Sequence, residues 1–153
     1  MSLLLALLLL VPAGAGTCAG FALPAAGPVV RGFAPEGAYA GHWGVDLAVP
    51  AGTTVRAPAA GLVTFAGTVA GNRTVTIDHG AGIRSSLSYL SSHLVRSGDR
   101  VDAGAAVGRS GVDHGIEAVH WSLRLGDHYF DPMRVTGCGS LLGEVRLAEV
   151  RGS

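Results

Sequence analysis

Two histidines and one aspartate have the residue types and the spacing of a metal site. His42 and Asp46 are close neighbours in the stretch His42-Trp43-Gly44-Val45-Asp46, and His120 lies in a separate segment far downstream. Zinc binds imidazole nitrogen and carboxylate oxygen readily, and a catalytic zinc site keeps three protein ligands and one open position. We therefore predict that His42, Asp46 and His120 hold one zinc ion, although another divalent ion would suit the same donors. The alternative is a turn histidine, a capping aspartate and a half-buried histidine with no shared role.

The composition describes one domain of ordinary size with balanced charge. The chain has 153 residues, and eleven basic residues, all of them arginine, balance eleven acidic ones. That length is sufficient for a buried core. Because the charges balance, the sequence has no excess of positive charge of the kind that binds nucleic acid. The 24 glycines favour turns and short strands over long helices.

The first nineteen residues predict a signal peptide. An apolar run from Leu3 to Val11 precedes small residues, although the usual positive charge before the run is missing. The run is too short to span a bilayer, which needs about 20 apolar residues, so no lasting membrane span is expected. We expect cleavage near residues 15–19 and a secreted or cell-envelope protein; a buried N-terminal core segment is the alternative. A disulfide between Cys18 and Cys138 would suit that oxidising setting if cleavage retains Cys18.

The remaining chain reads as short strands separated by turn residues. Residues 20–41 are rich in glycine, proline and alanine, which predicts a loosely structured lead-in with a short strand at Val29-Val30. His79-Gly80-Ala81-Gly82 predicts a hairpin turn. Such regularly spaced strands indicate an all-β domain, a compact two-sheet sandwich or barrel with few or no helices. The other expected strands are Thr53–Ala57, Gly61–Ala66, Thr74–Asp78, Ile83–Leu90 and Arg100–Gly108.

One pattern occurs twice, which suggests a duplicated unit. Residues 49–57 and 95–103 both read V-x-x-G-x-x-V-x-A, and each copy predicts a turn followed by a strand. Chance similarity is the alternative in a chain this rich in glycine, alanine and valine. Residues 136–153 are expected to form a C-terminal tail, with a possible frayed helix from Leu141 to Val150.

Taken together, these motifs resemble the M23 (lysostaphin/LytM-type) zinc metallopeptidases. The resemblance covers roughly residues 29–135 and rests on H-x-G-x-D at residues 42–46, the 49–57 segment, Gly98-Asp99-Arg100-Val101, Gly104–Gly108 and His120. It implies a two-sheet β fold built on a duplicated hybrid motif. It also implies that His42, Asp46 and His120 are the zinc ligands, and that peptides of bacterial peptidoglycan are the substrate.

The chain departs from that family at both histidines that do not bind the metal. The usual closing motif H-x-H is Ala118-Val119-His120 here, and counting back from Gly98 places Tyr89 where the family's other histidine is expected. General acid–base catalysis typically raises the reaction rate by about 10²–10⁴-fold, and one hydrogen-bond donor to the oxyanion raises it by about 10²–10³-fold. Tyr89 is a candidate oxyanion donor, and His114 and Glu117 are candidate proton acceptors. Solvated loop residues are the alternative for both acceptors.

Three classes of function follow from these residues. The first is a secreted zinc endopeptidase that cleaves peptide cross-links of peptidoglycan. The second is a catalytically impaired metal-binding module that binds cell wall or regulates another wall hydrolase. The third, a lipoyl or biotinyl carrier with similar duplicated hairpins, needs a modifiable lysine, and the chain has no lysine.

Overall fold

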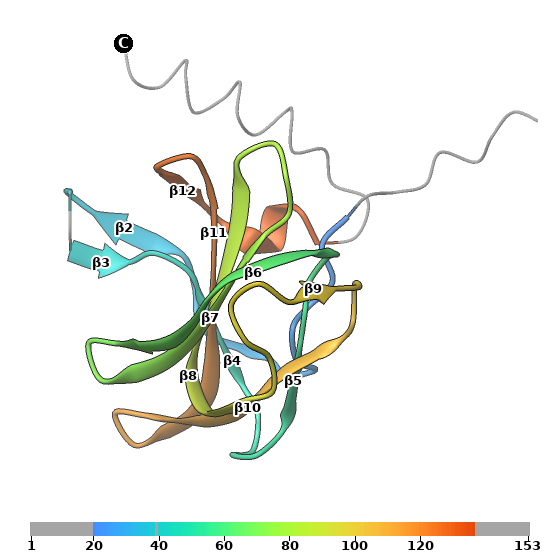
Figure 1. Ribbon diagram of the computed structural model, residues 1–153. Helices are drawn as coiled ribbons and strands as arrows, with labels where there is room; N and C mark the ends of the chain where they lie inside the picture. Colours follow the sequence, from blue (N-terminus) through green and yellow to red (C-terminus); the bar gives the residue numbers. More distant parts are fainter. Residues whose placement is uncertain (1–19, 39, 137–153) are drawn as a thin grey trace, which may run out of the picture.

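The computed structural model describes residues 20–38 and 40–136, and within them the protein is built almost entirely of β-strands (Figure 1). One short 3-10 helix, η1 at Pro132–Arg134, follows the last strand. The predicted all-β class is therefore confirmed. The strands are β1 Val29–Arg31, β2 Ala34–Glu36, β3 Ala40–His42, β4 Val45–Ala48, β5 Thr54–Arg56, β6 Gly61–Val69, β7 Asn72–Asp78, β8 Ile83–His93, β9 Arg100–Val101, β10 Ala106–Asp113, β11 Ile116–Leu125 and β12 His128–Phe130.

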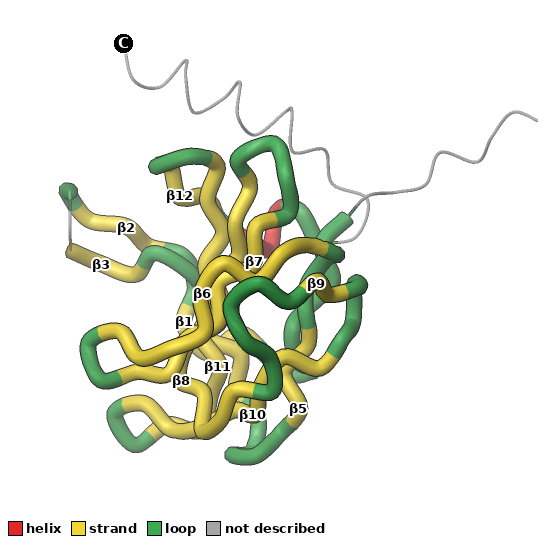
Figure 2. Tube along the Cα trace, in the orientation of Figure 1, coloured by secondary structure: helices red, strands yellow, loops and turns green. Residues whose placement is uncertain are grey.

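Ten of these strands form one large antiparallel sheet, and β2 and β3 form a small separate one. The large sheet runs in the order β1-β4-β11-β10-β8-β7-β6-β9, with β5 beside β10 and β12 beside β11. Strand β11 also pairs with β8, so it contacts four neighbours and occupies the centre of the sheet. The tips of the β2–β3, β6–β7 and β10–β11 hairpins lie on one side of the molecule (Figures 1 and 2).

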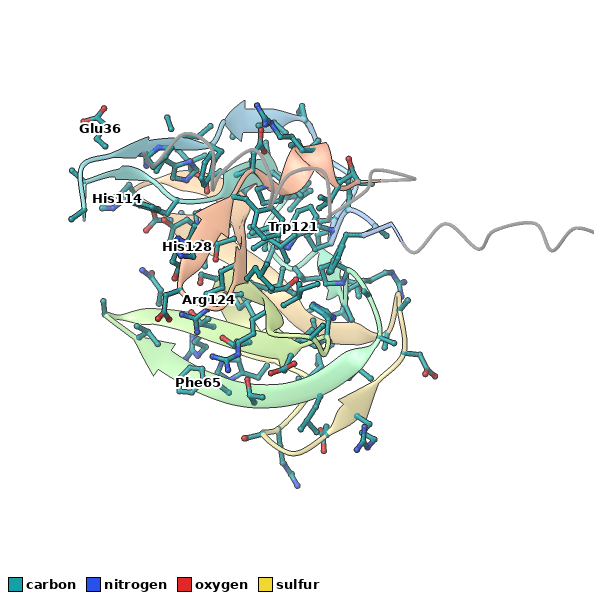
Figure 3. All side chains as sticks on the ribbon, turned by 90° about the horizontal axis from the view of Figure 1, so that it is seen from above. Glu36, Phe65, His114, Trp121, Arg124 and His128 are labelled. Atoms are coloured by element: carbon teal, nitrogen blue, oxygen red, sulfur yellow. The ribbon has the colours of Figure 1, made fainter. Side chains whose placement is uncertain are left out.

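Strand alternation separates a core face from an open face. On β11, Val119, Trp121 and Leu123 are fully buried, because alternate side chains of a strand point to opposite faces. In Figure 3, Trp121 lies deep among the packed side chains. His120 and Ser122 lie between these core residues and therefore point to the other face of the sheet. Trp121 also donates from Nε1 to Ser85 Oγ at 3.4 Å, which satisfies its only polar atom.

The two copies of the repeated pattern form the same turn. In the first copy Thr53 N donates to Pro50 O at 3.1 Å, and in the second Asp99 N donates to Arg96 O at 3.1 Å. Each turn carries a glycine at positive φ, 84° at Gly52 and 96° at Gly98. The copies also make matching bonds to different strands, because Gly52 N and Gly98 N donate to Ser110 O and Val63 O, both at 2.8 Å. The duplicated turn-and-strand unit is therefore real in three dimensions.

The structure differs from three expectations about the strands. The predicted strand Arg100–Gly108 is two strands, because a turn with Gly104 at φ 81° separates β9 from β10. Residues 20–41 contain three strands rather than a loose lead-in, and Phe21 and Ala25 join the core. Strand β11 was not predicted at all, since Ser122 and Arg124 interrupt its apolar pattern.

Several expectations fall on residues outside the described range. The signal peptide at residues 1–19, the Cys18–Cys138 disulfide and most of the tail at residues 136–153 lie there. In the part of the chain that is described, no helix is long and apolar enough to cross a bilayer.

Trp121 is the largest fully buried side chain of the described residues, and its truncation tests where the core sits. We expect Trp121→Ala to lower the free energy of unfolding by about 3–5 kcal/mol, because it removes a large buried ring and leaves a cavity. Val112→Ala is the matched control, since Val112 is 54% exposed and its truncation should change stability by less than about 0.5 kcal/mol. Urea unfolding followed by circular dichroism measures both. Equal stability of the two variants would contradict the proposed core.

Candidate metal centre

The pairing of β4 with β11 brings two of the three predicted ligands face to face. Asp46 and His120 are register partners in that antiparallel pair. His42 arrives from the end of β3, and all three ligand atoms lie within 4.8 Å of one another. His120 Nδ1 lies 2.7 Å from Asp46 Oδ1, and His42 Nε2 lies 3.1 Å from both Asp46 Oδ1 and His120 Nδ1. The three predicted ligands therefore converge on one point.

The hydrogen bonding of His42 shows why a cation fits among these atoms. Its Nδ1 lies 2.7 Å from Gly32 O, and a carbonyl oxygen only accepts, so this nitrogen carries the proton. In a neutral imidazole the lone pair then sits on Nε2, which faces the carboxylate oxygen of Asp46. Two acceptors at that distance need a proton or a cation between them. A hydrogen bond to the other ring nitrogen is also the usual support of a metal-bound histidine.

The carboxylate of Asp46 is kept ionised by its surroundings. Burial alone would raise its pKa, but hydrogen bonds and charge from His120 and His42 outweigh that effect, so the pKa of Asp46 lies below its ordinary value. An ionised carboxylate is the form that binds a divalent cation. The site therefore presents a permanent negative charge at neutral pH beside two imidazoles.

Gly44 sets the distance between the His42 turn and the His120 ring. A Cβ atom at this position would lie 2.5 Å from Trp121 O and 2.7 Å from His120 Nε2. Neither group can move away from an added Cβ, because Trp121 O belongs to a central strand and His120 is a predicted ligand. The glycine between His42 and Asp46 is therefore a spacing requirement of the site.

Tyr89 lies against the same centre in a strained conformation. Its ring centroid is 5.6 Å from that of His120, and its φ of 64° is unusual for a non-glycine residue. The strain arises at an irregularity in β8, where Leu90 pairs with Ser110 but Ser92 pairs with Arg109. Burial, then the charges of Asp113 and Asp46 and a hydrogen bond to Asp113, raise the pKa of Tyr89 to about 12. The phenol therefore keeps its proton at neutral pH and is a hydrogen-bond donor, here to Asp113.

The other two predicted catalytic residues lie on the β10–β11 hairpin without a contact to the triad. His114 is at the hairpin tip with φ 48°, its side chain is 88% exposed, and its Nε2 lies 3.6 Å from Asp113 Oδ2 (Figure 3). Glu117 is exposed and, by strand alternation, points away from the face that carries His120. Ala118, by contrast, shares the His120 face and is 2% exposed. The geometry brings Tyr89 to the centre and leaves His114 and Glu117 outside it.

Comparison with known families decides the assignment. The profile of peptidase family M23 matches residues 40–132, which include all three converging ligands. The chain belongs to peptidase family M23. That range contains every strand of the large sheet except β1. It also contains both copies of the repeated turn. The resemblance in the motifs is therefore confirmed at the level of the family and its fold.

Curated relatives match part of their own length. The chain is 36% identical over 101 residues to an uncharacterized protein of Mycobacterium tuberculosis, covering 61% of this chain and 40% of that protein. It is 33% identical over 100 residues to the DD-carboxypeptidase/endopeptidase Mpg of Neisseria meningitidis, covering 61% of this chain and 22% of Mpg. The M23 domain described here thus corresponds to less than half of each relative.

Solved structures show the same fold. A crystal structure assigned to peptidase M23 from Pseudomonas aeruginosa superposes with a TM-score of 0.67 and 34% identity, covering 81% of this chain and 53% of that one. The antimicrobial peptidase lysostaphin from Staphylococcus simulans superposes with a TM-score of 0.65 and 25% identity, covering 75% and 52%. Both similarities extend well beyond the metal-binding motif.

An open groove of about 830 Å³ extends from the metal centre of this M23 domain across the open face of the sheet. Its floor is made of hydroxyl side chains in two cross-strand rows. Thr74 Oγ1 bonds Ser88 Oγ at 2.9 Å in the row that contains His120, and Thr76 Oγ1 bonds Ser86 Oγ at 3.0 Å in the next row. Such a floor offers donors and acceptors to the backbone of an extended peptide.

The walls of the groove contain residues that the sequence did not single out. Trp43 and Tyr129 meet edge to face with ring centroids 5.7 Å apart, and both line the groove. Asp113, the partner of Tyr89, was not predicted either, because its contact depends on the β8 irregularity. The serine and threonine rows carry a signal in retrospect, since polar residues alternate with apolar ones on both β7 and β8.

Gly44→Ala tests the spacing requirement. We expect zinc affinity to fall at least about tenfold, because the new methyl group would displace the His120 ring. Gly32→Ala is the matched control, since a Cβ there meets nothing within 4 Å and the carbonyl that accepts from His42 remains. Zinc titration against a competing chelator measures both variants. Wild-type affinity in Gly44→Ala would contradict the assignment of His120 as a ligand.

Proposed function

We propose that the protein is a zinc metalloendopeptidase that cleaves peptide cross-links of bacterial peptidoglycan. The observation that carries this proposal is the triad of His42, Asp46 and His120, gathered at 2.7–3.1 Å at one end of a groove suited to a peptide. The M23 assignment and the DD-carboxypeptidase/endopeptidase activity named for the relative Mpg support it.

Each part of the site has a role in that reaction. His42, Asp46 and His120 would hold one zinc ion, which supplies Lewis-acid chemistry when bound. The phenol of Tyr89 has a single proton, which it shares with Asp113 in this structure; in the reaction it would turn to donate that proton in a hydrogen bond to the oxygen that gains negative charge as the peptide bond is attacked. The hydroxyl rows bind the extended backbone of the substrate and hold the scissile bond beside His120. His114 and Glu117 remain candidates for proton transfer only if the β10–β11 hairpin moves.

The proposed substrate also places the protein outside the cytoplasm. The apolar run at residues 3–11 supports export, and peptidoglycan is an extracytoplasmic polymer. We therefore propose a secreted or cell-envelope location. Its partner is cell-wall peptide rather than nucleic acid.

A second function is favoured by one specific observation. Ala118 stands on the His120 face, two residues before the ligand, and its methyl group can neither donate nor accept a proton. A protein that kept the metal but lost turnover would bind cell wall or regulate another wall hydrolase. The two functions differ in one measurable property, which is cleavage by the zinc-loaded protein.

Removal of the metal tests the proposed enzyme. We expect stoichiometric zinc in the purified protein, and we expect chelation to abolish release of peptides from peptidoglycan, because the three ligands have no other role at the centre. His120→Ala should lose both zinc and cleavage. His128→Ala is the matched control, since His128 is exposed on β12, and it should retain both. Unchanged cleavage in the presence of chelator would contradict a metalloenzyme.

Tyr89→Phe separates catalysis from metal binding. Loss of the hydroxyl should leave zinc content unchanged and lower kcat by about 10²–10³-fold, the usual contribution of one oxyanion donor. His114→Ala and Glu117→Gln should change kcat much less, because neither residue contacts the triad. The assay is peptide release from purified peptidoglycan at saturating substrate. If zinc binds fully and neither the wild type nor any variant cleaves, the regulatory module is the correct function.

A further inference from the structure

A positively charged residue that the proposed reaction does not use, Arg124, lies beside the groove, next to the lining residues Ser122 and Tyr129. Arg124 follows His120 and Ser122 on β11 with uninterrupted pairing to β8, so strand alternation places all three on the open face. Its guanidinium carbon lies 5.9 Å from the ring centroid of Tyr129, which lines the groove. Arg124 therefore lies on the open face of the sheet, near the C-terminal end of β11.

Charge pairing distinguishes Arg124 from its neighbour in the same row. Arg84, its register partner on β8, is paired through Nε with Asp78 Oδ2 at 3.4 Å. Arg124 has no ion pair with an acidic residue in the segments 20–38 and 40–136, and its recorded partner there is the Tyr129 ring. A guanidinium stacked on an aromatic ring keeps its planar fork of donors available for a carboxylate. The row Asp78, Arg84 and Arg124 thus has one uncompensated positive charge.

We propose that Arg124 is a specificity-determining residue whose guanidinium binds a carboxylate of the peptide substrate. This inference rests on the proposed peptidase function. Arg124 is four positions after His120 on β11, which is about 13 Å along a strand. An extended peptide lying on the hydroxyl floor would place a carboxylate near Arg124 when its scissile bond is about four residues away, beside His120. Acidic peptides are therefore the preferred substrate class.

Asp127 is the group that opposes this preference. It lines the groove near Tyr129 and would attract an ammonium group instead of a carboxylate. Asp127 is exposed to solvent, whereas Arg124 is half-buried against Tyr129, and charges are screened less when they are partly buried. The contribution of Arg124 should therefore exceed that of Asp127.

The test uses peptides released from peptidoglycan, with their carboxylates free or converted to amides. Binding to the zinc-loaded protein is followed by the fluorescence of Trp43, which lines the groove, and cleavage is followed as kcat/KM. Arg124→Gln should weaken binding and lower kcat/KM for the free acids by about tenfold to a hundredfold. Wild type and Arg124→Gln should bind the amidated peptides equally well and cleave them with equal kcat/KM. Arg84→Gln is the matched control, and Arg124→Lys should lose less than Arg124→Gln because it keeps the charge.

The outcomes separate this inference from the proposed function. If the wild type binds or cleaves amidated peptides as well as the free acids, or better, the carboxylate site is refuted while the peptidase function stands. Equal effects of Arg84→Gln and Arg124→Gln also refute it. If acidic peptides bind through Arg124 and no peptide is cleaved, the peptidase function fails and the carboxylate site stands. Absence of binding to either form overturns the inference.

Discussion

The register between β4 and β11 is the constraint on which the rest of the structure depends. Asp46 is opposite His120 on the open face, and on the core face Leu47 is opposite Val119 and Val45 is opposite Trp121. All four core residues are at most 1% exposed, so burial of these side chains fixes the pairing. A slip of one residue would expose the apolar set and turn both ligands inward. The hydrophobic core therefore aligns the metal site from the opposite face of the sheet.

The position of His42 is fixed in a different way, because His42 does not belong to the large sheet. It ends β3 of the small sheet, and two backbone features fix its position. Gly32 O holds the ring through Nδ1, and the missing side chain of Gly44 lets the turn approach His120. The resulting cluster sets His42 Nε2 and His120 Nδ1 against a carboxylate oxygen of Asp46, so a proton or a cation is needed between them. A bound cation would replace these protons and would stabilise the folded protein, so metal binding and folding stability would be coupled in this site.

The convergence of the three candidate ligands and the fold class could be predicted from the sequence because both depend on short-range patterns. The H-x-G-x-D spacing combines two ligands with the glycine that spaces them, and β-branched runs between glycines marked most strands. Strand β11 was not predicted, because its open face carries His120, Ser122 and Arg124, which break the apolar run that identified other strands. Asp113 was not predicted for another reason. Its contact with Tyr89 requires an irregularity in β8, and irregular register has no signature in residue type alone.

In the proposed reaction, the phenol of Tyr89 would limit the proton transfers that are possible at the centre. Histidine can both accept and donate a proton near neutral pH. The phenol of Tyr89, buried and beside Asp113 and Asp46, has a pKa raised to about 12, so it keeps its proton at neutral pH. The strained backbone at φ 64° holds its ring against the His120 ring. In the proposed reaction Tyr89 would therefore stabilise developing negative charge but would not act as a base. The proton acceptor in that reaction would be a group other than Tyr89.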